Sequence, residues 1–534
     1  MDAARSLSLQ DIDDDTLIVV FRFLSVSSIL AIRETCKRME GISRMRIVWQ
    51  NAYTCQVLLQ GFPAPYASAL DAVQLERNVL RALRVGNFWL SPSAAPRKVV
   101  EFKASSGTSV SEVHFLPRHE DRWLVTVSKG IWSMITCWDI PSICDPPERA
   151  QAVQIAEWSP KGMLFTGFVV NSDPDSEGIL AASVSGRGQQ SIEILNITSG
   201  SAEPPAFRTV DSIDTNFRVI ALQGELIAFS NDSSDTTIMN WRTGNAALLC
   251  SSEPPVDQHF QYNRCLQVVF THKSILVVRA RSIELFAEPA LHPPNEPSLP
   301  HYPLAYHTFG WIDGVSVSLQ ALPSDRITGC SVDPLSILLR AETDDPWASD
   351  THTLNLFTLQ PNPLYAEDSP VISNSVDANL SQVVSSQSAT SPLERAPYLF
   401  PPVHSSLTSP SVHGFLRCTG IILGQYGTAV WIQPRPSRST DLTMLDVHAS
   451  ETQAAETTRP RESLAAAVFA GPLQRHHPEI SLDARTLWAE SDRSSNWTAI
   501  DYDEELGRIA LGSIDGRVTL LELGLPCDQQ GWTR

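Results

Sequence analysis

Residues 508–521 read Arg-Ile-Ala-Leu-Gly-Ser-Ile-Asp-Gly-Arg-Val-Thr-Leu-Leu, two short apolar runs on either side of an Asp-Gly pair. Asp-Gly favours the tight turn of a β-hairpin, because glycine adopts positive φ angles at little steric cost. The flanking runs are rich in Ile, Leu and Val, the residues that strands prefer. The stretch therefore predicts two antiparallel strands near the end of the chain.

Similar apolar strand endings recur from about residue 98 onward. The seven candidates are Thr136–Asp139, Ile192–Asn196, Thr237–Trp241, Ile283–Phe286, Leu354–Phe357, Ala429–Trp431 and Val518–Leu521. Leu195, Asn240 and Leu285 follow one another at steps of 45 residues, the length of one four-stranded propeller blade. The layout resembles degenerate WD repeats, although only Trp138-Asp139 is a literal Trp-Asp pair. It predicts a mainly-β, seven-bladed propeller, with a β-sandwich or two smaller β-domains as the alternatives.

A propeller must close its ring, and one common solution pairs a strand from the start of the body with the last blade. The run Lys98–Phe102 is placed to do this, and residues 497–523 would supply the other strands of that blade. We therefore expect the two ends of the body to lie side by side.

Two long insertions interrupt the later spacings, near residues 366–412 and 433–462. The first holds many serines and prolines, and the second is rich in Pro, Arg, Ser and Thr. Such compositions bury too little apolar surface to offset the entropy lost on ordering. We expect both insertions to be disordered within a β-propeller domain that spans residues 97–534.

Composition excludes several classes of protein. The 534 residues carry a formal net charge of -19, which disfavours a nucleic-acid surface. The nine cysteines are scattered without a Cys-x-x-Cys pair, which indicates a reducing compartment and no structural zinc. The acidic start does not resemble a signal peptide, and no run approaches the ~18 apolar residues of a membrane span. We expect a soluble protein of the cytoplasm, the nucleus or both.

Catalytic motifs are absent from the sequence. It has no Gly-rich phosphate loop, Gly-x-Ser-x-Gly elbow or His-Glu-x-x-His helix, and the pair His476-His477 lacks a third metal ligand at a suitable spacing. We therefore expect no enzyme, no cofactor and no metal.

A binding face of the propeller could instead be formed by arginine side chains. The alternative is that each of these arginines is an ordinary surface residue. The five candidates are Arg187, Arg242, Arg264, Arg279 and Arg281.

Three short amphipathic helical patterns precede the β-rich body, at Ile12–Leu24, Ser28–Met39 and Arg44–Leu59. They predict a small three-helix domain over residues 1–60. A further helical pattern within 61–96 would connect this domain to the propeller. The fold class is therefore α+β and multidomain.

The stretch from Ile12 to Trp49 resembles an F-box, with apolar residues and a final Trp at the family's places. The matching positions are Ile12, Asp15, Leu17, Phe21, Leu24, Ile29, Leu30, Cys36, Met39 and Trp49. Asp13 and Val26 stand where the family commonly has proline, from which we expect weaker binding to its partner. The alternative is a helical cap that only packs on the β-rich body.

The resemblance implies an F-box protein with a C-terminal WD-repeat-like propeller, an architecture of fungal type. F-boxes dock on a Skp-type adaptor and, through it, on a cullin, while the propeller presents an unknown client protein for ubiquitin transfer. Adaptor contact would fall to Ile12, Leu17, Phe21, Leu24, Ile29, Leu30 and Trp49. The rival functions are a non-degradative interaction scaffold and an intracellular propeller hydrolase, the latter marked by a central cavity lined with carboxylates or His.

Overall fold

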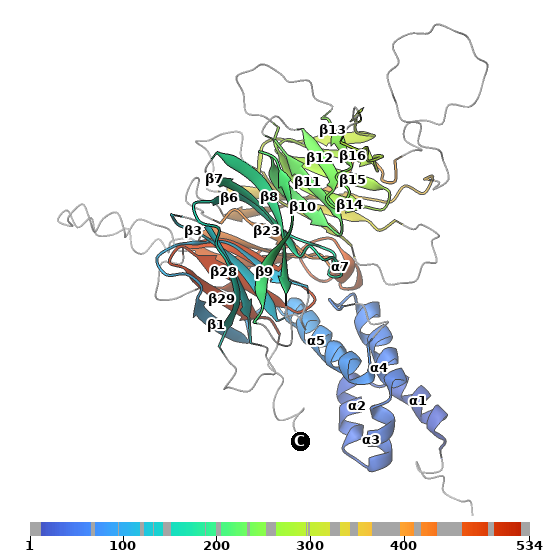
Figure 1. Ribbon diagram of the computed structural model, residues 1–534. Helices are drawn as coiled ribbons and strands as arrows, with labels where there is room; N and C mark the ends of the chain where they lie inside the picture. The colour runs from blue at the N-terminus through green and yellow to red at the C-terminus, as the bar shows by residue number, and fades with distance from the viewer. Residues whose placement is uncertain are drawn as a thin grey trace, which may run out of the picture.

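The computed structural model describes most of the chain from residue 12 to residue 524. The ranges outside the described residues are 66–69, 94, 118–121, 132, 142–150, 187, 199–203, 232–234, 252–262, 295, 297–298, 321–331, 342–350, 366–395, 411–417, 435–461 and 490–495. A small helical module precedes a ring of seven β-sheets, and Figure 1 shows the module below the ring. The predicted seven-bladed propeller with an N-terminal helical region is confirmed.

Each sheet is a blade, numbered here in chain order, whose strands pair antiparallel except that β17 pairs in parallel with β13. Blade 1 holds β2 (Val110–Leu116), β3 (Trp123–Lys129), β4 (Ser133–Asp139) and β5 (Val153–Trp158). Blade 2 holds β6 (Leu164–Val170), β7 (Leu180–Gly186), β8 (Gln189–Thr198) and β9 (Ala206–Asp214). Blade 3 holds β10 (Arg218–Gln223), β11 (Leu226–Ser230), β12 (Thr236–Asn240), β13 (Ala246–Leu249) and the added β17 (Pro300–His301).

The later blades follow the same order. Blade 4 holds β14 (Cys265–Thr271), β15 (Ser274–Arg279), β16 (Ser282–Ala287) and β18 (Ala305–Thr308). Blade 5 holds β19 (Ile312–Leu319), β20 (Leu335–Ala341), β21 (Thr351–Leu359) and β22 (Val403–Pro410). Blade 6 holds β23 (Ile421–Leu423), β24 (Thr428–Pro434), β25 (Glu462–Val468) and β26 (Arg485–Trp488).

Blade 7 closes the ring with strands from both ends of the body. It holds β27 (Trp497–Asp503), β28 (Arg508–Ser513), β29 (Arg517–Glu522) and β1 (Lys98–Lys103). β1 pairs antiparallel with β29, Val100 opposite Leu520, which confirms the predicted closure. The turn between β28 and β29 places Gly516 at φ +81°, where an added Cβ would lie 2.4 Å from the carbonyl oxygen of Ser105. Glycine is therefore required at this turn.

The core of the propeller lies between successive blades. Buried apolar side chains form a separate cluster in the gap between blades 1 and 2, and further clusters fill the next gaps around the ring. The innermost strands of neighbouring blades contact one another all the way round, including β27 with β2. The ring is thus continuous.

Two predictions for the propeller need correction. Six of the seven strand endings lie in third strands, but Ala429–Trp431 lies in β24, the second strand of blade 6. Residues 396–410, within the range expected to be disordered, include β22, whose backbone pairs with β21 along eight residues. Backbone hydrogen bonds to a buried strand stabilise this Ser-rich segment despite its polar composition. The rest of that insertion, and residues 435–461 of the second, lie outside the described residues.

The helical module differs from three helices. It contains α1 (Asp14–Arg22), α2 (Val26–Arg33), α3 (Lys37–Ser43) and α4 (Arg46–Ala52), continued by a π turn (Tyr53–Val57) and a 3₁₀ turn (Leu58–Gln60). The predicted helix Ser28–Met39 is wrong because the chain breaks before Cys36, whose backbone is extended at φ -162°. The Thr35 hydroxyl donates a hydrogen bond to the Ile32 carbonyl oxygen at this break.

A long helix joins the module to the propeller. α5 (Ala72–Leu90) begins with a capping box between Asp71 and Gln74. It runs from beside α4 to the underside of the ring (Figure 1). α5 lies within the range 61–96, and its Val73 is 58% exposed.

Candidate protein-interaction site

Asp13 starts the first helix of the module. Its carboxylate accepts hydrogen bonds from the Thr16 backbone N–H at 2.7 Å and from the Thr16 hydroxyl at 3.0 Å. These bonds lower the pKa of Asp13, so the charged form that caps the helix is favoured. The residue in place of the family proline therefore preserves the helix start rather than disrupting it.

The seven residues predicted to contact an adaptor fall into two groups. Leu17, Phe21, Ile29 and Trp49 are at most 3% exposed and form the core of the helical module. Their assignment to a contact surface is corrected, because helical periodicity marks an apolar face without saying whether a partner or the protein's own core covers it. Ile12, Leu24 and Leu30 are partly buried and border the surface.

The exposed apolar face of the module lies on the other side of α1. Val19 is 57% exposed, Val20 46% and Phe23 81%. These side chains recur at i, i+1 and i+4, which places them together on the face opposite Leu17 and Phe21. This surface, named here the α1 face, was not predicted from the sequence. Its signal in the sequence is that the first helix has apolar residues in addition to those at the spacing of Leu17 and Phe21.

Ion pairs fix the helices that carry the α1 face. The Arg38 guanidinium lies 2.6 Å from the Asp14 carboxylate and donates to the Ile12 carbonyl oxygen at 2.5 Å. The Arg33 guanidinium makes a bidentate pair with Glu76 of α5, at 2.8 and 2.9 Å. A bidentate pair restrains orientation as well as distance. The module is thus tied to the helix that enters the propeller.

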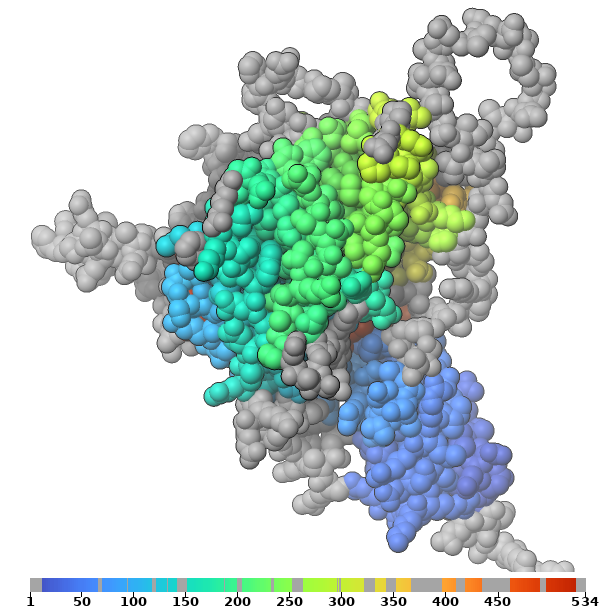
Figure 2. Space-filling model, in the orientation of Figure 1, coloured from blue at the N-terminus to red at the C-terminus, as the bar shows by residue number. Residues whose placement is uncertain are grey.

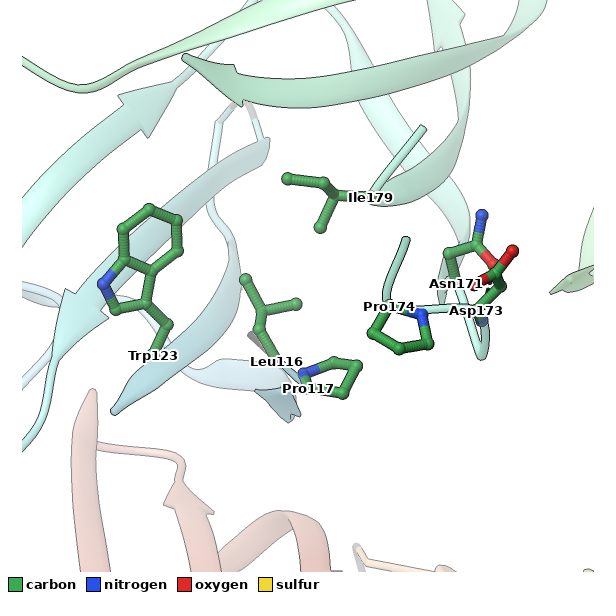
Figure 3. A pocket seen from close by; sticks show the side chains of 7 residues that line it. All are labelled: Leu116, Pro117, Trp123, Asn171, Asp173, Pro174 and Ile179. Carbon is green, nitrogen blue, oxygen red and sulfur yellow. Dashed lines mark hydrogen bonds between the residues drawn. The ribbon is translucent and has the colours of Figure 1, made fainter. Parts of the chain in front are cut away.

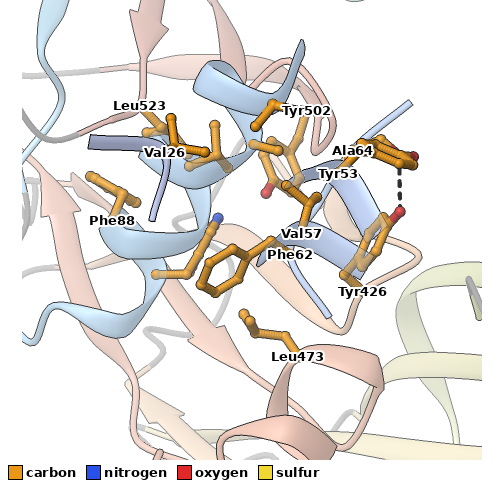
Figure 4. Packing of buried hydrophobic residues seen from close by; sticks show 14 of the residues in the cluster. Val26, Tyr53, Val57, Phe62, Ala64, Phe88, Tyr426, Leu473, Tyr502 and Leu523 are labelled. Carbon is orange, nitrogen blue, oxygen red and sulfur yellow. Dashed lines mark hydrogen bonds between the residues drawn. The ribbon is translucent and has the colours of Figure 1, made fainter. Parts of the chain in front are cut away.

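The module and the propeller share one buried core. A single cluster of apolar side chains runs from α1–α5 into the gap between blades 6 and 7. Figure 4 shows Val57 and Phe62 of the module beside Leu473, while the Tyr426 hydroxyl donates to the Ala64 carbonyl oxygen at 2.9 Å. Phe62 packs so closely on Gly86 that a Cβ there would lie 2.4 Å from its ring.

An arginine from blade 6 holds the end of α5. Arg485 donates hydrogen bonds to the carbonyl oxygens of Ser91 and Phe88, and its guanidinium lies 5.0 Å from the Trp89 ring centroid. A cation at a helix C-terminus complements the negative end of the helix dipole. The helical module is therefore firmly attached, and Figure 2 shows it as a separate lobe beside the ring.

The module occupies one end of the blades. Its contacts include Tyr426 in the turn from the first to the second strand of blade 6, and Leu523 after the third strand of blade 7. In an antiparallel blade, the turn between the second and third strands lies at the opposite end. That end carries Arg281 in the β15–β16 turn, with its guanidinium 5.2 Å from the Trp311 ring centroid.

The predicted arginines do not form one face. Arg242 follows the third strand of blade 3, at the module's end, where Glu177 and Glu225 pair with it at 2.7 and 2.9 Å. Arg279 is fully buried against Glu284, at 2.8 Å. Arg264 is exposed near Arg281, and Arg187 lies outside the described residues.

A histidine with two acidic neighbours lies on the innermost strands at the seam of the ring. In His114 of β2, Nε2 lies 3.8 Å from Glu112 and Nδ1 lies 4.0 Å from Asp501 of β27. Desolvation lowers the pKa of His114, but the two carboxylates outweigh it and the net shift is upward. The arrangement joins the first and last blades electrostatically. Within the described ranges, no group of three or more His, Cys, Asp or Glu side chains is placed to hold a metal ion.

A small hollow opens between blades 1 and 2 (Figure 3). It is lined by Leu116, Pro117, Trp123, Asn171, Asp173, Pro174 and Ile179. The space holds about one water molecule, too little for a substrate.

Among the described helices, none combines the length and apolarity needed to cross a bilayer.

Comparison with known proteins gives structural likeness only. No protein-family model matches the chain, and no curated protein matches its sequence. The fold is similar to a chain of the Chaetomium thermophilum Polycomb Repressive Complex 2 bound to GSK126 and to one of its humanized mutant bound to GSK343. Each match has 14% identity and a TM-score of 0.45, and covers 80% of this chain and 98% of the other. A likeness at this level carries no argument about activity or partners.

Proposed function

We propose that this protein is the substrate-recognition subunit of a cullin-type ubiquitin ligase. Its helical module would dock on a Skp-type adaptor, and its propeller would bind the client protein in the cytoplasm or nucleus. The observation that carries the proposal is the exposed α1 face on a module whose other side is fused to the propeller by a continuous buried core. A module attached in this way would hold the adaptor and the client protein at a fixed separation.

The contact residues in this proposal differ from those expected at first. Val19, Val20 and Phe23 supply the apolar contact, with Ile12, Leu24 and Leu30 at its border. Leu17, Phe21, Ile29 and Trp49 act indirectly, by packing the helices on which that surface rests. The Asp13 cap supports full rather than weakened docking, because the helix starts in place.

The protein contributes geometry rather than bond-making chemistry in this proposal. His114 with Glu112 and Asp501 is the observation that would favour a propeller hydrolase. The nearby hydroxyls of Ser111 and Thr498 donate to the backbone carbonyl oxygens of Val127 and Val110, which supports a structural role for this group. The acceptors given for both hydroxyls are backbone carbonyl oxygens, whereas an activated nucleophile needs a hydrogen bond to a general base.

A direct binding measurement tests the adaptor contact. Purified Skp-type adaptor should bind the full chain, and Val20→Asp combined with Phe23→Asp should weaken binding at least about tenfold, because charges replace the apolar contact. Val73→Asp is the matched control, since Val73 is 58% exposed on α5, and should leave binding unchanged.

Two outcomes contradict the proposal. If the wild-type chain does not bind the adaptor, the ligase role is wrong. If adaptor binds but the assembled complex with cullin transfers no ubiquitin to a bound client, the non-degradative scaffold takes its place.

A further inference from the structure

An exposed apolar stripe marks the rim of blades 3 and 4. The chain leaves β16, pairs β17 in parallel with β13 of blade 3, and returns as β18, the last strand of blade 4. Along this path Leu299 is 59% exposed, Tyr302 58%, Leu304 36% and Tyr306 57%. These four side chains, named here the rim stripe, lie within eight residues. They are four of the twenty large hydrophobic side chains exposed in the described part of the chain.

The backbone of β18 presents these side chains beside a sheet edge. β18 pairs with β16 on one side, and no described strand lies on its other side. His307 turns toward blade 5, 5.6 Å from the Phe357 ring, so Tyr306 points to the opposite face of the strand. Residues 305–308 contain no proline, so the backbone N–H groups that face away from β16, on every second residue of the strand, are available for pairing.

The charges around the rim stripe have one prevailing sign. The sequence from 282 to 325 contains acidic residues but neither Lys nor Arg. Glu296, three residues before Leu299, is exposed, and the whole chain carries a net charge of -19. Two cations elsewhere in blade 4 have contacts of their own: the Lys273 backbone carbonyl oxygen accepts a hydrogen bond from the Glu288 N–H, and the Arg281 guanidinium lies over the Trp311 ring. A segment that carries Lys or Arg beside apolar residues complements this surface.

We propose that the rim stripe binds an extended segment of a partner protein, with alternating apolar and basic residues, as an added strand on β18. Main-chain hydrogen bonds to the edge would supply affinity, and contacts with Tyr302, Leu304 and Tyr306 would supply selectivity. The inference rests on the proposed function and makes this segment the client's recognition element. Figure 1 shows β13 and β16 across the ring from the helical module, so client and adaptor would not collide.

A peptide-binding experiment on the full chain tests the proposal. The probe is a fluorescent peptide of about nine alternating Lys and Val residues, the length of one strand. A second peptide has Glu in place of Lys. We expect saturable binding of the Lys peptide. The Glu peptide, or the variant Tyr302→Ser with Tyr306→Ser, should weaken binding about tenfold. Val403→Ser on β22 is the matched control, because Val403 is 63% exposed on the outer strand of blade 5.

Hydrogen exchange gives an independent measurement on the wild-type chain. Bound Lys peptide should slow amide exchange in Ala305–Thr308, because the edge N–H groups become paired. Protection of the innermost strands instead, equal binding of both peptides, or undiminished binding by the double Tyr variant would overturn the proposal. So would a wild-type dimer that the double variant converts to a monomer, since the stripe would then bind a second copy.

The adaptor measurement separates this proposal from the ligase role. The double Tyr variant should bind the Skp-type adaptor as wild type does. Failure of adaptor binding with peptide binding intact would refute the ligase role alone, whereas the reverse would refute only the rim stripe.

Discussion

Two connections between a third and a fourth strand end up in opposite environments in this propeller. In blade 6 the connection from β25 to β26 carries α7 (Pro472–His476), and its Leu473 is fully buried against the helical module. In blade 4 the connection from β16 to β18 runs over the rim, and its Leu299 and Tyr302 are more than half exposed. The connection from the third to the fourth strand thus packs against the helical module in blade 6, whereas in blade 4 it exposes apolar side chains to solvent.

The difference lies in what covers each connection. The module brings Tyr53, Val57 and Phe62 to blade 6, so apolar residues there lose their contact with water. Burial of apolar surface is the main favourable term in such an attachment. No described element covers the rim of blade 4 in the same way. The ring therefore has a closed side, where the module covers blade 6 and is held in a fixed position. Its open side is the rim of blade 4, which is available to a partner.

Removing Trp89 should produce the largest effect, on the closed side. Trp89 is 1% exposed and packs on Phe88 and Tyr502, so Trp89→Ala leaves a cavity between module and propeller. We expect the free energy of unfolding to fall by about 3–5 kcal/mol, measured by chemical denaturation. Trp311→Ala, at a partly exposed position beneath Arg281, should cost much less. If the two variants lost the same free energy of unfolding, the packing of Trp89 at the junction would contribute no more stability than that of Trp311 on the open side.

A buried carboxyl group should make the closed side sensitive to pH. Glu504 accepts hydrogen bonds from the Tyr426 N–H at 2.9 Å, the Thr428 N–H at 3.2 Å and the Thr428 hydroxyl at 2.5 Å. Burial nevertheless raises the pKa of Glu504 from 4.5 to about 7. The folded state thus holds this proton more tightly than the unfolded state, so its stabilising contribution is complete below pH 4.5 and is lost as pH rises through about 7.

The expected loss is up to about 3 kcal/mol in the free energy of unfolding between pH 4.5 and 8. Glu504→Gln should flatten the pH profile relative to wild type, because the amide does not titrate. Glu296→Gln, an exposed acid on the open side, should leave the profile as it is. Parallel profiles for wild type and Glu504→Gln would mean that Glu504 stays ionised in the fold.

The sequence predicted the closure of the ring in blade 7 more readily than it predicted which apolar residues are exposed. The Asp515-Gly516 turn and the run Lys98–Phe102 are local signals, and both lie where expected. Leu17 and Phe21 have the same helical spacing whether they face a partner or the core, so the sequence could not separate these roles. The rim stripe was missed because Pro300 and Pro303 interrupt its apolar pattern, and because exposure depends on which blades the chain crosses.

The smallest predicted effect comes from a single hydroxyl. Tyr426 is 6% exposed, and burial raises the pKa of its phenol, so it donates to the Ala64 carbonyl oxygen across the junction at all ordinary pH values. Tyr426→Phe keeps the packing but removes the donor, which should cost about 1 kcal/mol in the free energy of unfolding. Tyr306→Phe on the exposed rim stripe should cost nothing measurable, since water replaces whatever its hydroxyl binds. If both variants lose the same stability, the Ala64 bond does not fix the module; if only Tyr426→Phe does, polar contacts reinforce the apolar junction.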